Sequence, residues 1–211
     1  MRNTLAALIR VHKRQGIHTY LYGKYRRVFY HKLRKKYHFG EWHEEPYELR
    51  PYAWDIKNYV NTLVSTSYKP MCVCEIGCGL GDIIRNTRAD KKIGIDISKE
   101  TIECAKFLGG DSEFFVGSFD SFNDIVQKRK IDVLISVNFI HNIEPEKLKM
   151  YYDQIMKNIT VENIILDVID SSGYKYCHDI DFLFPGRRGE TVISSYKVSS
   201  GGERKVYVID L

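Results

Sequence analysis

Apolar and polar positions follow a regular rhythm from residue 71 to the end of the chain. Short apolar runs of strand length alternate with longer amphipathic stretches of helix length. The pattern predicts strands at 71–76, 92–97, 113–117, 131–137 and 162–168, with helices at 81–88, 99–108, 120–129 and 145–158. Strands that alternate with helices of this length predict right-handed crossovers and a parallel sheet.

The two ends of the chain depart from this rhythm. Two alternating segments, 191–198 and 204–211, are separated by Ser-Ser-Gly-Gly-Glu, which predicts a β-hairpin and an antiparallel end to the sheet. Before residue 70 the spacing of apolar residues predicts helices at 3–14, 19–38 and 52–66. Between them, the Gly, Pro and aromatic residues of 39–51 indicate a loop.

Charge divides the chain into two parts. The net charge is +5, but residues 1–40 contain 11 Lys and Arg and no acidic residue, so residues 41–211 carry −6. This division excludes a uniformly basic nucleic-acid binder and indicates a mildly acidic domain behind a basic, Tyr-rich segment. No apolar run approaches the roughly 18 residues of a membrane span, and residues 1–15 lack the features of a signal peptide.

Five cysteines bear on the cellular compartment and on metal binding. Their odd number, and the crowding of Cys72, Cys74 and Cys78 into one strand and its turn, argue against a disulfide framework. The pattern suits a reducing cytosol, so we expect a cytoplasmic protein. A strand turns only alternate side chains to one face, and no fourth ligand lies near these three thiols, so we expect no metal site there.

The residues that follow the first predicted strand indicate which type of ligand the protein binds. The turn has acidic-x-Gly-x-Gly-x-Gly spacing, with Glu75 before Gly77, Gly79 and Gly81. A dinucleotide fold has G-x-G-x-x-G spacing, whereas a carboxylate at this position would repel pyrophosphate and suits an ammonium or sulfonium group. Asp96 ends the next strand, where an acid can accept hydrogen bonds from both ribose hydroxyls.

These motifs resemble those of the class I S-adenosylmethionine-dependent methyltransferases. The resemblance rests on EIGCGLG at 75–81, GIDIS at 94–98 and VLISVNFIHNI at 133–143. It implies an α/β fold with a seven-stranded, mostly parallel, doubly wound sheet in the order 3-2-1-4-5-7-6. The last strand would be antiparallel. The methyltransferase domain would cover residues 50–211, behind a helical extension and lid loop at 1–49.

The resemblance also implies a role for each matching residue. Gly77 and Gly79 would pass under the methionine part of S-adenosylmethionine, and Cys78 between them is a further expected cofactor contact. Glu75 would orient the turn or bind the ammonium group through water. Asp96 would hold the ribose. The other expected cofactor contacts are Ile97 and Ser118 at the adenine, Phe119 behind the ring, and Asn138 near the reactive end.

Two histidines are candidates for catalysis. His141 follows the fourth strand at the edge where open α/β sheets bind ligands, and it could accept a proton from a hydroxyl acceptor or pack beneath the cofactor. His178 lies in the region where the resembling enzymes often place an acceptor loop. Asp167, Asp170 and His178 together leave a metal site as an alternative, although we expect none.

The lid loop and the basic segment bear on the acceptor. The loop contributes four candidate residues, Trp42, His43, Tyr47 and Tyr52. They either line the acceptor site or close on the cofactor, or they pack the helical extension onto the sheet. Our first interpretation of residues 1–38 is that they contact an anionic membrane surface, and the second is that they contact RNA phosphates and bases. The remaining interpretations are a solvated cap, a dimer contact or a transit signal. We therefore expect O-methylation of a sugar or lipid-linked glycan at the cytoplasmic face of the membrane, as in bacterial surface-polysaccharide assembly. The alternatives are an RNA methyltransferase and a non-catalytic cofactor-binding module.

Overall fold

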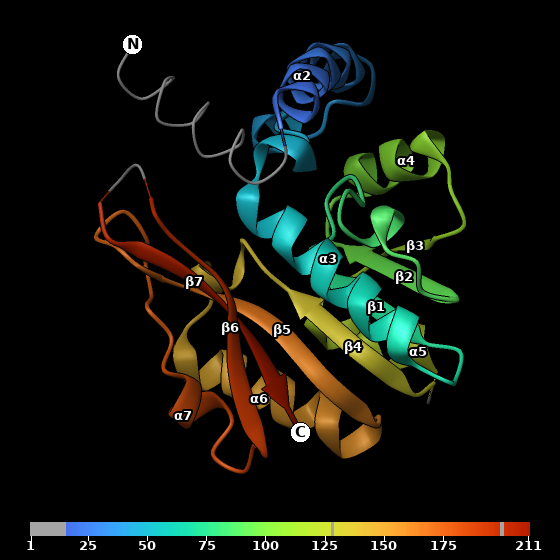
Figure 1. Ribbon diagram of the computed structural model, residues 1–211. Helices are drawn as coiled ribbons and strands as arrows, with labels where there is room; N and C mark the ends of the chain where they lie inside the picture. The colour runs from blue at the N-terminus through green and yellow to red at the C-terminus, as the bar shows by residue number, and fades with distance from the viewer. Residues whose placement is uncertain (1–15, 128, 199–200) are drawn as a thin grey trace.

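A single seven-stranded sheet organises the chain in the computed structural model, which describes residues 16–127, 129–198 and 201–211 (Figure 1). The strand order is β3-β2-β1-β4-β5-β7-β6, which confirms the order that the resemblance implied. The first five strands pair in parallel, β7 pairs antiparallel with β5, and β6 pairs antiparallel with β7. The strands are β1 (Cys72–Ile76), β2 (Lys91–Asp96), β3 (Glu113–Val116), β4 (Ile131–Ser136), β5 (Val161–Asp170), β6 (Gly189–Lys197) and β7 (Glu203–Asp210).

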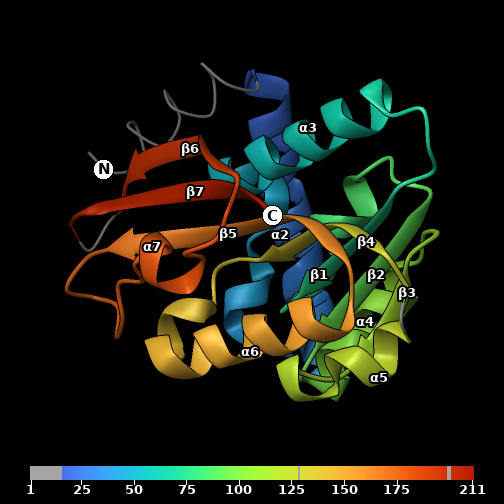
Figure 2. The same cartoon turned by 90° about the horizontal axis from the view of Figure 1, so that it is seen from below.

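Helices cover both faces of the sheet (Figure 2). The side chains of α3 join one buried apolar cluster with one face of the strands, and those of α6 and α7 join a second cluster on the other face. Both long covering helices begin with proline at the first helical position, where the missing N–H costs nothing. The helices are α2 (Ile17–Tyr37), α3 (Pro51–Thr66), α4 (Lys99–Leu108), α5 (Phe122–Val126), α6 (Pro145–Asn158) and α7 (Ile180–Leu183).

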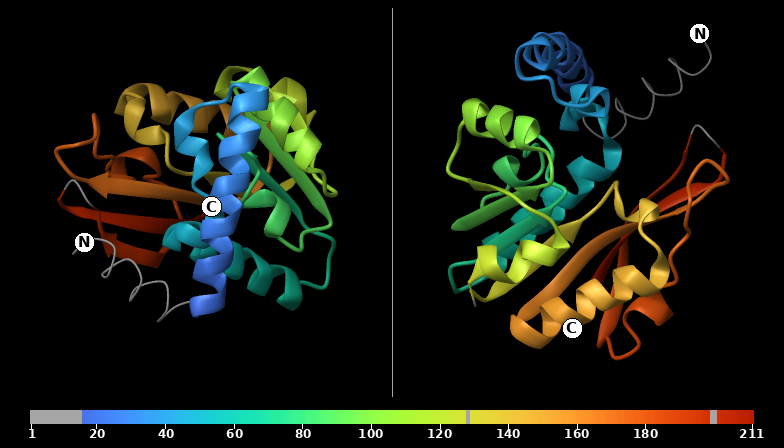
Figure 3. Two further views of the ribbon diagram at one scale, coloured as in Figure 1. Left: turned by 90° about the horizontal axis from the view of Figure 1, so that it is seen from above. Right: turned by 180° about the vertical axis from the view of Figure 1, so that it is seen from behind.

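The basic helix α2 lies across the side of the sheet on which the parallel strands end (Figure 3). It packs against α4 and against two short 3-10 turns, η1 (Glu41–Glu44) and η2 (Tyr47–Leu49), in the segment predicted as a loop. Its buried side chains include Tyr20, Tyr30 and Leu33. The helix predicted at 3–14 lies outside the described residues.

One predicted helix is absent from the described residues. The segment 81–88 forms turns and a single 3-10 turn, η3 (Ile84–Asn86), instead of an α-helix. Gly81 has a positive φ of 74°, and the N–H of Ile84 donates to the Glu75 carboxylate at 3.0 Å rather than to a helical carbonyl. The Glu75 carboxylate therefore takes the place of a helical carbonyl for this N–H, and the N–H groups of Asn86 and Thr87 make 3-10-type bonds to backbone carbonyls.

The helix predicted at 120–129 is shorter than expected. A 3-10 turn, η4 (Phe119–Ser121), precedes the five residues of α5, and Gln127 ends the helix in a left-handed conformation with φ of 53°. Ser118 caps the turn, because its hydroxyl accepts the N–H of Asp120 at 3.2 Å.

Candidate functional site

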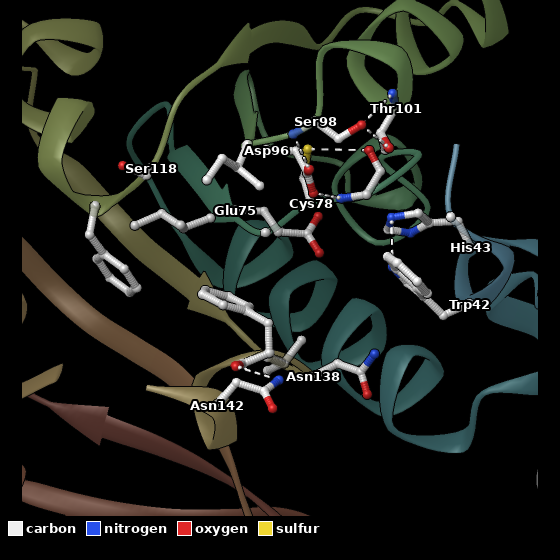
Figure 4. A pocket seen from close by; sticks show the side chains of 18 of the residues that line it. Trp42, His43, Glu75, Cys78, Asp96, Ser98, Thr101, Ser118, Asn138 and Asn142 are labelled. Atoms are coloured by element: carbon white, nitrogen blue, oxygen red, sulfur yellow. Dashed lines mark hydrogen bonds between the residues drawn. The ribbon is translucent and has the colours of Figure 1, made fainter. Parts of the chain in front are cut away.

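A cavity of about 890 Å³ opens where β1, β2 and β4 end (Figure 4). The volume is within the range of roughly 300–1,000 Å³ that is typical of small-molecule sites. Its walls come from the Gly-rich turn after β1, the segments after β2, β3 and β4, and the lid segment that follows α2. Every residue that the sequence assigned to the cofactor borders this cavity: Glu75, Gly77, Cys78, Gly79, Asp96, Ile97, Ser118, Phe119 and Asn138.

The Gly-rich turn requires glycine for both its conformation and its contacts. Gly77 and Gly79 have positive φ values of 68° and 56°, which L-residues with a side chain rarely adopt. A Cβ atom on Gly77 would lie 2.5 Å from the Phe139 ring, and one on Gly79 would lie 2.7 Å from Nδ1 of His43. The turn can therefore press closely against the segment after β4 and against the lid.

Asp96 fixes the turn and still presents acceptor capacity. Its Oδ2 accepts the N–H of Gly79 at 2.9 Å, and its Oδ1 accepts the N–H of Ser98 at 2.9 Å. Each carboxylate oxygen has a second lone pair, so the side chain can accept further hydrogen bonds from hydroxyl groups in the cavity. The neighbouring Ile97 is 78% exposed and offers an apolar surface to a planar ring.

Glu75 is a buried carboxyl group at the floor of the cavity. Burial raises its pKa to about 8, although the N–H of Ile84 and the charge of Arg50 act in the opposite direction. The side chain is therefore largely protonated at neutral pH. A cationic ligand nearby would lower this pKa and favour the carboxylate.

Cys78 and Phe119 are two buried side chains that border the cavity. Burial holds the pKa of the Cys78 thiol well above its ordinary value, so this sulfur is not a nucleophile at neutral pH. Phe119 is buried, and its ring stacks on Tyr151 with centroids 4.9 Å apart. Tyr151 also donates to Asp120 at 3.2 Å, which connects α6 to the turn after β3.

Asn138 is held in a left-handed conformation by two charged groups. Its φ is 69°, and its N–H donates to Oδ1 of Asp167 at 2.8 Å. Arg204 donates through Nη2 to the Asn138 side-chain oxygen at 2.8 Å, and its Nε lies 3.4 Å from Oδ2 of Asp167. Both charged groups are buried, so this network positions the Asn138 amide at the cavity wall.

The lid contributes polar and aromatic side chains. Trp42, His43 and Tyr52 border the cavity, whereas Tyr47 stacks on Trp54 with centroids 5.7 Å apart. Trp42 donates through Nε1 to Nε2 of His43 at 3.0 Å. Burial and the charge of Arg50 lower the pKa of His43 although nearby carboxylates oppose this, so its imidazole is neutral at pH 7.

A buried cluster behind the Gly-rich turn was not foreseen in the sequence. The Asp82 carboxylate forms ion pairs with three arginines. Its oxygens lie 3.2 Å from Arg26 on α2, 2.9 Å from Arg50 just before α3, and 3.2 Å from Arg85 in the same turn. Burial acts to raise the pKa of Asp82, but these three charges lower it below its ordinary value. Arg50 also borders the cavity and presents a positive charge there.

The two histidines expected to act in catalysis do not border the cavity. His178 is buried, and its Nε2 lies 2.9 Å from the carbonyl oxygen of Ile140. His141 packs edge-on against Tyr174, and burial, Arg204 and His178 lower its pKa to about 4. The histidines that border the cavity are on the lid segment, at His38 and His43.

Neither a metal site nor a membrane span is formed by the described part of the chain. Within residues 16–127, 129–198 and 201–211, no three His, Cys, Asp or Glu side chains are placed to hold a metal ion. Asp167, Asp170 and His178 therefore do not form the alternative metal site. Over the same residues, no helix combines the length and apolar character needed to cross a membrane.

Comparisons with known proteins identify the fold. No protein-family model and no curated protein sequence matches this chain. Magnesium protoporphyrin IX methyltransferase (ChlM) from Synechocystis PCC 6803, with bound SAH, aligns over 92% of this chain and 99% of its own, with a TM-score of 0.60 and 14% identity. The chain has the Rossmann-like methyltransferase fold.

Two further structures share this fold. The kinase-methyltransferase WbdD aligns over 74% of this chain with a TM-score of 0.55 and 15% identity, and this chain spans only 38% of WbdD. The plantazolicin methyltransferase BpumL, in complex with SAH and a monoazolic desmethylPZN analogue, aligns over 75% of this chain and 83% of its own, with a TM-score of 0.54 and 13% identity. Sequence identities this low support a shared fold, but they do not indicate a shared substrate.

Proposed function

We propose that the protein is an S-adenosylmethionine-dependent methyltransferase. The observation that carries the proposal is the cavity in which Glu75, the Gly-rich turn and Asp96 meet at the carboxyl edge of the sheet. The fold supports it, since structural neighbours with this architecture include methyltransferases with bound SAM or SAH.

The cavity residues match the chemical parts of this cofactor. Asp96 would accept the ribose hydroxyls, and the exposed Ile97 would pack on the adenine. The ammonium and sulfonium groups would lie within reach of the Glu75 carboxyl, and the Arg50 guanidinium would pair with the methionine carboxylate. The cofactor's carboxylate thus has the Arg50 cation in the cavity wall, and its cationic groups would favour the ionised form of Glu75.

Bound S-adenosylmethionine supplies a methyl group on a positively charged sulfur, and the chain's task is to hold an acceptor atom in line with it. Asn138 is suited to this, because Asp167 and Arg204 fix its backbone and side chain. The lid would close the opposite wall with Trp42 and His43, and it would limit the access of water.

For the acceptor, we propose a hydroxyl of a sugar or lipid-linked glycan. An exposed indole ring at Trp42 and the amides of Asn138 and Asn142 border the cavity, and such groups suit sugar faces and hydroxyls. The structural neighbours leave this choice open, because their names include a porphyrin methyltransferase and a plantazolicin methyltransferase.

Calorimetry with S-adenosylmethionine tests the cofactor site. We expect micromolar binding that Asp96→Ala abolishes and that the surface control Asp153→Ala leaves unchanged. Unaltered binding by Asp96→Ala would refute the assignment. Transfer of a labelled methyl group to lipid-linked oligosaccharides and to RNA then distinguishes the acceptor classes, and binding without transfer to any acceptor would indicate a non-catalytic module.

A further inference from the structure

The helix α2 has two apolar faces, and only one of them is covered. Its inner face packs on the protein through Tyr20, Gly23, Tyr30 and Leu33, which are buried. On the opposite side, Leu21, Tyr25 and Val28 follow at intervals of four and three residues, and they are 57%, 70% and 59% exposed. This spacing places the three side chains on one line along the helix, on the side opposite to its buried residues.

Three further large apolar side chains of the same helix are also exposed. We call the exposed apolar side chains of α2 the outer stripe, and its members are Ile17, Leu21, Tyr22, Tyr25, Val28 and Phe29. These six are among the fourteen exposed large hydrophobic residues of the described chain, although α2 is only 21 residues long. Single exposed apolar residues are ordinary on a protein surface, but a concentration of this kind marks an interaction site.

Uncompensated positive charge surrounds the outer stripe. The helix contains no acidic residue, and its exposed basic side chains are Lys24, Arg27, Lys32, Lys35 and Lys36. No carboxylate of the described residues forms an ion pair with any of these five. By contrast, Arg26 forms an ion pair with Glu48, and Arg34 forms one with Glu44.

We propose that the outer stripe docks α2 onto an anionic lipid bilayer. Aliphatic side chains such as Leu21 and Val28 enter the acyl boundary, Tyr25 suits the headgroup level, and the flanking lysines and arginine face anionic lipids. RNA would match the charge but would leave Leu21 and Val28 without stacking partners. A second copy of the helix would match the apolar line but would oppose like charges.

Membrane docking of α2 would place the cavity next to the lipid surface. His38 directly follows α2, and Trp42 lies four residues further on, so both line the cavity on a segment that continues from the helix. The Trp42 side chain is 74% exposed, and its amphipathic ring suits the same interface. This inference goes beyond the proposed methyl transfer and holds whether or not the acceptor is a lipid.

Vesicle co-sedimentation of the full chain tests the proposal. The two vesicle types are phosphatidylcholine alone and phosphatidylcholine mixed with phosphatidylglycerol. One variant removes apolar character from the outer stripe (Leu21→Ser, Tyr25→Ser and Val28→Ser), and a second removes charge (Arg27→Gln, Lys32→Gln and Lys35→Gln). A matched control alters exposed residues on α6 and α7, Met150→Ser, Lys157→Gln and Phe182→Ser.

We expect the wild type and the α6–α7 control to bind anionic vesicles and to remain free of neutral ones. Either α2 variant should bind more than about tenfold more weakly. Circular dichroism and S-adenosylmethionine calorimetry on the same samples check that the variants fold, which separates this proposal from that of the cofactor site. Undiminished binding by the apolar variant, no binding by the wild type, or binding of RNA or of a second copy in place of vesicles would overturn the proposal.

Discussion

Tyr30 donates its hydroxyl hydrogen to Oδ1 of Asp82 at 2.6 Å, across 52 residues of sequence. Tyr30 belongs to the basic N-terminal helix α2, and Asp82 belongs to the turn that borders the cavity. The contact is buried, and guanidinium groups from Arg26, Arg50 and Arg85 surround the same carboxylate. The extension is therefore an integral support of the Gly-rich turn.

Removing the charge of Asp82 should destabilise the protein strongly. Asp82→Asn removes the carboxylate that pairs with Arg50 and Arg85, and it leaves Arg26 with Glu48 alone. Breaking buried ion pairs of this kind typically costs about 3–5 kcal/mol. Urea unfolding measures the loss. The surface variant Asp153→Asn should change stability by less than about 1 kcal/mol, since its partner Lys149 is in an exposed pair. A cost for Asp82→Asn as small as this control would show that the cluster contributes little.

The same carboxylate predicts a response to acid. The pKa of Asp82 in the folded protein is below the ordinary value of 3.8, because the three arginines outweigh the effect of burial. Its contribution to stability is thus fully present above pH 3.8 and is lost as the pH falls through the lower folded pKa. Unfolding curves of Asp82→Asn should lack this loss below pH 3.8, in contrast to those of the wild type.

Glu75 should release a proton when the cofactor binds. Burial raises its pKa to about 8, and a cationic ligand favours the ionised form, so binding near pH 7 expels up to one proton. Calorimetry in buffers of different ionisation enthalpy measures this release. Glu75→Gln, which cannot ionise, should show none; equal proton release by the two proteins would exclude Glu75 as the source.

Glu75 also makes stability depend on pH in the cofactor-free protein. Between pH 4.5 and about 8 the group is ionised in the unfolded chain and protonated in the folded one. The free energy of unfolding should therefore fall as the pH rises through this window, by up to about 1.4 kcal/mol per pH unit. Glu75→Gln should remove this slope, and urea unfolding at several pH values measures it.

Two substitutions at Asn138 separate its backbone role from its side-chain role. Its φ of 69° suits glycine, so Asn138→Gly should relieve backbone strain while it removes the amide that Arg204 holds. Asn138→Ala loses the same amide and adds strain of roughly 1 kcal/mol. We expect both variants to lose methyl transfer to a similar extent and only the alanine variant to show the added cost in stability. Unchanged activity in both would rule out the side chain as a positioning group.

His141 should behave as a neutral packing residue. Its pKa of about 4 is below the ordinary 6.5, so its contribution to stability is present above pH 6.5 and is lost as the pH falls toward 4. We expect His141→Gln to retain most of its methyl transfer at pH 7 and to show a flatter stability profile between pH 6.5 and 4. A loss of turnover of about 100-fold, with the fold intact, would instead support the catalytic role expected from the sequence.

Local pattern accounts for the strands of the sheet and for the position of the cavity. Apolar runs of strand length and the terminal hairpin predicted the strands, and the resemblance to class I methyltransferases implied their observed order. Glu75, Gly77 and Gly79 lie in one turn, and Asp96 ends the adjacent strand, so their proximity follows from parallel pairing alone. Short-range spacing was enough here because the carboxyl ends of neighbouring parallel strands meet at one edge.

Contacts between segments that are distant in sequence determined the features that the local pattern did not predict. Periodicity favoured a helix at 81–88, but the Asp82 carboxylate is held by arginines from other segments, and the Glu75 side chain takes the N–H of Ile84. Arg204, on the last strand, orients Asn138 from 66 residues away. The position of His141 after the fourth strand suggested a catalytic role, yet in the fold it packs against Tyr174 and does not line the cavity.

The sequence by itself determined the sheet, the Gly-rich turn and the concentration of positive charge before residue 41. Only the tertiary structure decided which of these basic side chains form buried ion pairs and which remain exposed. Arg26 turns inward to Asp82, whereas Arg27 and Lys32 stay exposed beside the outer stripe. The physical reason is that a helix of 3.6 residues per turn distributes its charges around its axis, and only the packing against η1, η2 and α4 fixes which face is buried.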